Sequence, residues 1–157
     1  MTNPTPATGT AEEAGSLVTR FGAIRIDPER IITFRFGVFG FGSQTRFVLA
    51  EVPEREVPFK LLQSVDDAEV GFLVLPIDVG QGPISRNDLE RACTDLGIDL
   101  QALVALAIVT LRADSDAGPG TINLKAPVLI DSERRLGCQY VLADEGYDLK
   151  VPLAVAA

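Results

Sequence analysis

The sequence predicts a single, mostly β domain: a small antiparallel β-barrel or sandwich-like fold with one or two short inserted helices. Short apolar segments, some of them alternating with polar residues, recur along the chain and are separated by Gly, Pro and Asp, as in barrels and sandwiches. Only one segment has a clear helical period. The 157 residues are typical of one domain and are enough to bury a core without disulfides.

The N-terminal segment lacks the residues that build a core. After Met1, residues 1–16 contain no large aliphatic or aromatic side chain. We therefore expect a disordered tail over 1–16 and a barrel domain over 17–157. The tail also lacks the apolar run of a signal peptide, and the longest apolar run, 103–111, is about half of the ~20 residues that span a bilayer. We expect a soluble, cytoplasmic protein with no membrane partner.

The first third of the chain predicts three strands and a bend. Residues 18–27 carry Ile24 and Ile26 in alternation and end at an Asp-Pro turn. Residues 31–36 and 45–52 are the next two strands. Between them, 37–44 is rich in glycine, but no Lys-Ser/Thr pair or helix start follows it, so a close-packed bend is favoured over a phosphate loop.

Two further strands, 59–64 and 71–77, flank the sequence VDDAEV, which places Asp66 and Asp67 side by side. Two hypotheses compete for this pair. Asp side chains commonly satisfy turn backbone between strands. A carboxylate enzyme would instead need both groups aimed at one atom, and adjacent residues on a regular element point in different directions. The turn is the favoured interpretation.

The helix is predicted over 85–97. Ser85 is suited to its N-cap, Asp88 to the third helical position, and Gly97 to its stop. A second short helical turn is expected within 99–105, followed by a strand over 106–112. Residues 121–131 and 138–143 predict a hairpin around the turn 132–137, and 147–154 predict a last edge strand that Pro152 ends.

The composition excludes several kinds of chemistry. The chain has no histidine, which removes the commonest general base and metal ligand. Cys93 and Cys138 have no metal-site or disulfide spacing, so we expect no metal and no cofactor. The net charge is −8, and residues 51–100 hold four basic and eleven acidic groups. This acidic middle argues against direct nucleic-acid binding and fits a basic protein partner, or solubility alone.

Four sequence blocks, in this order and spacing, resemble the family of flagellar assembly factors called FliW. The resemblance covers about residues 20–153. The blocks are FGAIRI (21–26), ITF with GVFGF (32–34 and 37–41), LQSVDD with FLV (62–67 and 72–74), and NLKAPVLI (123–130), followed by a strand with Gln139. The chain departs from the family pattern at Arg35-Phe36, at Phe39 and at Gly42, which makes this segment more apolar and more basic.

The resemblance implies a non-enzymatic, cytoplasmic barrel protein that holds flagellin before export. It also implies that the flagellin-free protein binds and antagonises the RNA-binding translational repressor CsrA, which couples flagellin synthesis to assembly. We expect the chain to be monomeric. The alternative is a small ligand-binding or carboxylate-based enzymatic barrel that uses Asp66, Asp67 and Lys125 at its mouth.

Candidate partner-binding residues follow from these expectations. The terminal segments of flagellin would need an apolar groove or strand edge, and Phe36, Phe39 and Phe41 are candidates for it. Core packing remains an equal alternative for Phe36 and Phe41, but three aromatic residues so close together cannot all point inward. Further candidates are the polar residues of the fourth block and the acids placed in or beside loops: Asn123, Lys125, Glu51, Glu54, Glu56 and Glu69.

Overall fold

A computed structural model describes residues 15–53, 56–111 and 120–153 of the chain. Its strands are β1 (Gly15–Thr19), β2 (Gly22–Ile26), β3 (Ile32–Thr33), β4 (Arg46–Glu51), β5 (Lys60–Ser64), β6 (Gly71–Ile77), β7 (Leu103–Leu111), β8 (Gly120–Asp131), β9 (Leu136–Gln139) and β10 (Val151–Pro152). The helices are the 3-10 turns η1 (Pro28–Arg30) and η2 (Leu100–Ala102) and the α-helix α1 (Arg86–Leu96).

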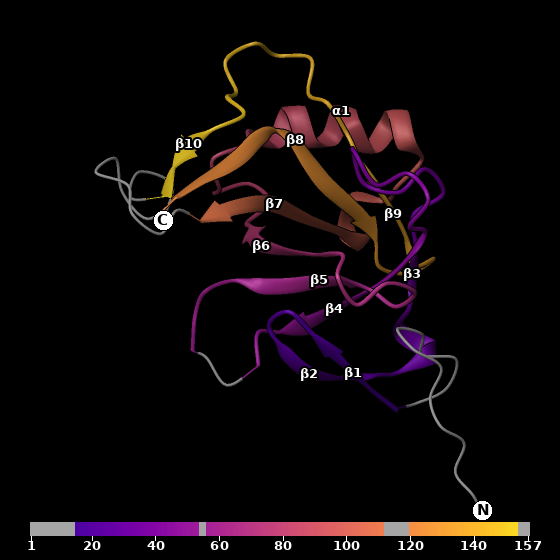
Figure 1. The fold of residues 1–157 in the computed structure, drawn as a ribbon. Helices are drawn as coiled ribbons and strands as arrows, with labels where there is room; N and C mark the ends of the chain where they lie inside the picture. The colour runs from indigo at the N-terminus through magenta and orange to yellow at the C-terminus, as the bar shows by residue number, and fades with distance from the viewer. Residues whose placement is uncertain (1–14, 54–55, 112–119, 154–157) are drawn as a thin grey trace, which may run out of the picture.

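Seven strands form one closed sheet in the order β8-β7-β6-β5-β4-β3-β9, and β9 pairs back with β8. Every pairing in this ring is antiparallel except that of β3 with β9, which is parallel and joins Thr33 to Leu136. β10 is added to β8 outside the ring, and β1 and β2 form a separate hairpin. In Figure 1 this hairpin lies beside β4 and β5, and α1 lies at the opposite end above β8. The predicted fold class is confirmed.

The two faces of the sheet carry separate apolar clusters. Phe34, Phe47, Leu62 and Leu106 belong to the cluster on one face. The cluster on the other face also includes the buried residues of α1 and of the β1–β2 hairpin. Because directly opposed residues such as Leu49 and Leu62 share a face, the register assigns each apolar side chain to one of these clusters.

The helix begins and ends where the sequence predicts. Ser85 Oγ accepts a hydrogen bond from Asp88 N–H at 3.1 Å, and Gly97 closes the helix with φ at 74°. Asp88 does not complete a capping box. Its carboxylate accepts a 2.6 Å hydrogen bond from the Tyr147 hydroxyl, which itself accepts from Ser85 N–H. The start of α1 is therefore tied to the C-terminal segment.

β8 is bent by an irregularity in its pairing with β7. Leu106 pairs with Val128 but Ile108 pairs with Asn123, so residues 124–127 stand opposite Ala107 alone. Asn123 Oδ1 accepts a 3.0 Å hydrogen bond from Ala126 N–H and closes this bulge. Figure 1 shows β8 turning sharply along its length. The bulge lets one strand pair with β7, β9 and β10.

Several predicted boundaries were wrong. Gly15 and Ser16, assigned to the tail, begin β1; residues 1–14 lie outside the described chain. The strand expected over 31–36 ends at Thr33, because a turn brings Gly37 N–H to Phe34 O at 3.0 Å.

The C-terminal half also differs in detail. The last strand comprises only Val151 and Pro152, so it begins four residues later than expected, and its pairing ends at Pro152 as predicted. β9 ends at Gln139, and the expected strand does not continue to 143. Among the described residues, no helix is long and apolar enough to cross a membrane.

Candidate partner-binding surface

The glycine-rich segment between β3 and β4 is a compact double turn, not a flexible linker. Val38 is buried and anchors it in the core, and Phe41 N–H donates to Val38 O at 2.6 Å. Gly37 has φ at 67°, and a Cβ there would lie 2.2 Å from Phe41 O, so only glycine fits. The side chains that project from this segment are therefore held on a defined backbone.

Three phenylalanines project from this segment to the surface. Phe36 is 84% exposed, Phe39 57% and Phe41 41%. Phe41 is partly anchored, because its ring packs edge-on against Phe72 with 5.3 Å between ring centroids. We call Phe36, Phe39 and Phe41 the aromatic surface. It contains the three aromatic candidates from the sequence, and all three lie outside the buried core.

Apolar hollows lie at both ends of the aromatic surface. Phe41 lines one of about 500 Å³, together with Phe21, Val70, Phe72, Ile108 and the exposed Leu111. Phe36 lines another of about 350 Å³ beside the end of α1, together with Leu96, Ile98 and Leu136. Exposed aromatic groups beside apolar hollows are typical of protein-binding surfaces.

Gln139 connects the aromatic surface to the bulge in β8. Its Oε1 accepts a 3.0 Å hydrogen bond from Phe39 N–H, and its Nε2 donates to Ala126 O at 2.9 Å. Asn123 closes the bulge, so its side-chain amide satisfies local backbone. Lys125 Nζ donates to Asp144 O at 2.9 Å. The structure thus places Asn123 in the support of the surface.

The LQSVDD block forms the turn between β5 and β6. Ser64 Oγ accepts hydrogen bonds from the N–H groups of Asp66 and Asp67, each at 3.2 Å. Asp67 Oδ1 accepts from Glu69 N–H at 2.9 Å, and the Asp66 carboxylate is paired with Arg46. The two carboxylates therefore stabilise a turn, and they do not face a common atom.

A family model described as FliW protein matches residues 17–153. The chain belongs to the FliW family. The flagellar assembly factor FliW of Natranaerobius thermophilus is 36% identical over 135 residues, which cover 85% of this chain and 87% of the relative. The one from Geobacter sulfurreducens is 35% identical over 138 residues, with 85% and 82% covered. A crystal structure of the flagellar assembly factor FliW matches with a TM-score of 0.69 at 30% identity, covering 88% of this chain and 96% of that one.

The departures from the FliW pattern in the double turn lie on the surface. Arg35, Phe36, Phe39 and Gly42 are exposed. None of them belongs to either apolar cluster. In this FliW-family chain these differences therefore change the side chains that the double turn presents at the surface.

The candidate acids do not form one patch. Glu51 and Glu56 lie where β4 connects to β5, while Glu69 lies in the turn at the other end of β5 and lines the hollow of Phe41. Glu51 is paired with Lys60. Glu54 lies outside the described residues. Of the three candidate acids that the structure describes, only Glu69 is next to the aromatic surface.

Sequence analysis missed the residues that complete the hollow of Phe41. Arg20 reaches it by donating from Nη2 to Gly71 O at 2.8 Å, and its guanidinium lies 5.0 Å from the Phe21 ring centroid. The Phe21-Gly22 pair was a sequence signal, because Gly22 turns the β1–β2 hairpin. Within 15–53, 56–111 and 120–153, no group of three or more Cys, Asp or Glu side chains is arranged to hold a metal ion.

Proposed function

We propose that this FliW-family chain is a flagellar assembly factor that binds flagellin in the cytoplasm before export, through the aromatic surface. We further propose that, when free of flagellin, it binds and antagonises the translational repressor CsrA. The exposure of Phe36, Phe39 and Phe41 on an anchored double turn is the observation that carries the flagellin proposal. The names of its relatives support a role in flagellar assembly.

The energetics suit such a partner. Fully covering a phenylalanine side chain stabilises a complex by roughly 1.5–3 kcal/mol before the costs of association. Phe36, the most exposed of the three, has the most to contribute, and Phe41 the least. The double turn is already ordered by Gly37 and Val38, so little backbone entropy is lost on binding. Amphipathic terminal segments of flagellin would place their apolar residues in the hollows beside Phe36 and Phe41.

The proposal is tested by titrating purified flagellin against the double variant Phe36→Ala with Phe39→Ala. We expect its Kd to rise at least about tenfold, because two anchors of this kind are each worth on the order of 1–2 kcal/mol in binding. Leu149→Ala is the matched control, since Leu149 is also exposed but lies near β10. Unchanged affinity of the double variant, with a melting temperature like that of the control, would refute the role of the aromatic surface.

A further inference from the structure

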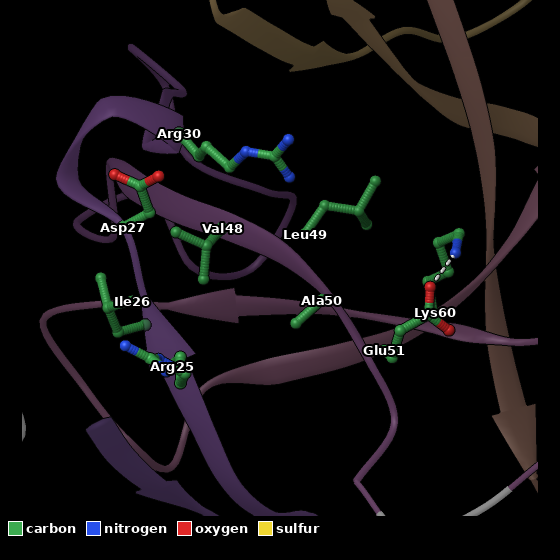
Figure 2. Close-up of a pocket in the computed structure, with 9 residues that line it drawn as sticks. All are labelled: Arg25, Ile26, Asp27, Arg30, Val48, Leu49, Ala50, Glu51 and Lys60. Atoms are coloured by element: carbon green, nitrogen blue, oxygen red, sulfur yellow. Dashed lines mark hydrogen bonds and ion pairs between the residues drawn. The ribbon is translucent and has the colours of Figure 1, made fainter. Parts of the chain in front are cut away.

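We propose that the open edge of β4 is a docking site for an extended, acidic segment of a partner protein, which pairs with β4 as an added strand. A hollow of about 900 Å³ lies along this edge (Figure 2). We call it the β4-edge hollow; it is lined by Arg25, Ile26, Asp27, Arg30, Val48, Leu49, Ala50, Glu51 and Lys60. It shares no lining residue with the hollows of Phe36 and Phe41, so this site is independent of the proposed flagellin surface.

Beyond Phe47, the backbone of β4 has no strand paired with it on the side of the hollow within the described parts of the chain. β3 covers β4 only at Arg46 and Phe47, whereas β5 pairs with it as far as Glu51. Val65 N–H donates to Arg46 O, and paired and unpaired positions alternate in an antiparallel ladder, so Val48 and Ala50 bond to β5. The N–H and C=O groups of Leu49 and Glu51 therefore point away from β5, into the hollow.

The turn that begins at Pro28 explains why β3 does not cover the rest of the β4 edge. In the antiparallel register of Ile32 with Phe47, residues 28–30 would pair with the rest of β4 if β3 began earlier. Instead Asp27 caps η1 by accepting from Glu29 N–H at 3.0 Å, and Pro28 begins the turn. Outside the β4–β5 ladder, no hydrogen bond to the backbone of Leu49 or Glu51 occurs in the described parts of the chain.

The charges beside this edge select an acidic partner. Lys60 is paired with Glu51, so among the other residues that line the β4-edge hollow the guanidinium groups of Arg25 and Arg30 face one carboxylate, that of Asp27. In the adjoining hollow, which Leu49 and Arg30 also line, Glu29 is offset by Arg135. Within the described ranges, neither arginine forms an ion pair. Figure 2 shows the Arg30 side chain extending from η1 toward Leu49. A partner strand paired with β4 would lie beside the guanidinium groups of Arg25 and Arg30. Carboxylates on that strand could therefore form ion pairs with them.

A second copy of the chain is a poorer occupant. Pairing of two β4 edges would bring Arg25 and Arg30 of both copies to the same interface, where like charges repel. An extended segment of a different protein meets no such cost, and main-chain hydrogen bonds to a strand edge supply its affinity.

The test uses the full chain and a short blocked peptide in which Glu alternates with Val. NMR hydrogen exchange should show the amides of Leu49 and Glu51 becoming protected when the peptide is added. The double variant Arg25→Glu with Arg30→Glu should raise the Kd about tenfold, because two attractions become repulsions. Arg91→Glu, on the exposed face of α1, is the matched control and should leave the Kd unchanged.

A second arm does not depend on folding of the double variant. The same peptide with alternate backbone nitrogens methylated should bind wild type at least about tenfold more weakly, because it cannot pair along a strand. Equal binding of the methylated peptide, or absence of protection at Leu49 and Glu51, would overturn the proposal. Tighter peptide binding after Glu12→Gln with Glu13→Gln would assign the site to the chain's own N-terminal segment. If the protein is a dimer that the peptide dissociates into monomers, the β4 edge would instead be the contact with a second copy of the chain. Either result would overturn the assignment to a partner protein.

Discussion

Gln63 supports the turn between β5 and β6, and replacing it by Met should destabilise the fold far more than an ordinary polar substitution does. Its side chain is 1% exposed. Nε2 lies 3.0–3.3 Å from the carbonyl oxygens of Ser64, Asp67, Ala68 and Val70. Methionine has nearly the same length and keeps the packing, so the change isolates the loss of these hydrogen bonds.

The magnitude follows from the two hydrogens on Nε2. They serve four carbonyl oxygens, and two of these keep a backbone donor after the substitution: Val70 O keeps Ser64 N–H and Asp67 O keeps Val70 N–H. The oxygens of Ser64 and Ala68 are the two that lose their donor. Each buried oxygen left without a donor costs about 1–3 kcal/mol, so Gln63→Met should lower the free energy of unfolding by about 2–4 kcal/mol. Repacking has little room to reduce this loss, because a Cβ on Gly71 would already lie 2.4 Å from Gln63 Oε1.

Urea unfolding measures the effect as a fall in the midpoint at constant slope. Gln101→Met is the control, since Gln101 is exposed, and it should change stability by no more than about 0.5 kcal/mol. Gln63→Glu adds a pH readout: burial raises the pKa of the new carboxyl group, so this variant should lose stability as pH rises through that pKa. A loss below about 1 kcal/mol for Gln63→Met would refute the assignment of Gln63 as the donor that holds the turn.

Three other perturbations test the supports and the charges. Asn123→Ala should cost about 1 kcal/mol in urea unfolding, because Ala126 N–H loses its acceptor; an unchanged midpoint would contradict the role of Asn123 in the bulge. The hydrogen bond from Tyr147 lowers the pKa of Asp88, so its contribution to stability is present above the ordinary carboxyl pKa and is lost as pH falls through the lowered one. Tyr147→Phe should make the acid loss of stability shallower in a pH series of melting curves, and parallel curves would refute this. If CsrA antagonism is electrostatic, a quadruple Glu→Gln variant should weaken inhibition of RNA binding by the repressor at about 50 mM salt and have little effect at about 300 mM; equal inhibition in all conditions would favour a steric cause. The four positions are Glu51, Glu54, Glu56 and Glu69.

Features set by neighbours in the sequence were predictable. Ser85 and Gly97 define both ends of α1, because helix caps depend on one residue and its adjacent backbone. The same reasoning identified Asp67 as a turn residue, since its acceptor role involves the backbone two residues later. The resemblance to FliW likewise rested on local blocks, and the family match confirms it.

Features set by distant residues were not predictable. The partial covering of Phe41 depends on its ring contact with Phe72, a residue 31 positions later in the chain. The bulge at Asn123 exists because β8 pairs with three strands, and one strand's composition does not reveal that. The open edge of β4 requires both the short β3 and the full pairing with β5. In each case the deciding contact joins segments that the chain connects only through its fold.

The parallel pairing of β3 with β9 closes the seven-stranded sheet into a barrel. Only Thr33 and Leu136 are paired there, and Phe39 N–H adds its hydrogen bond to Gln139 across 100 positions of chain. Contacts of such large sequence separation carry the highest loop-closure entropy, so we expect them to form late in folding and to open first in native-state fluctuations. The double turn that presents the phenylalanines lies at this seam. A chain in which β3 and β9 have not yet paired would therefore lack an ordered aromatic surface. A partner that binds this surface would bind only chains whose barrel has closed.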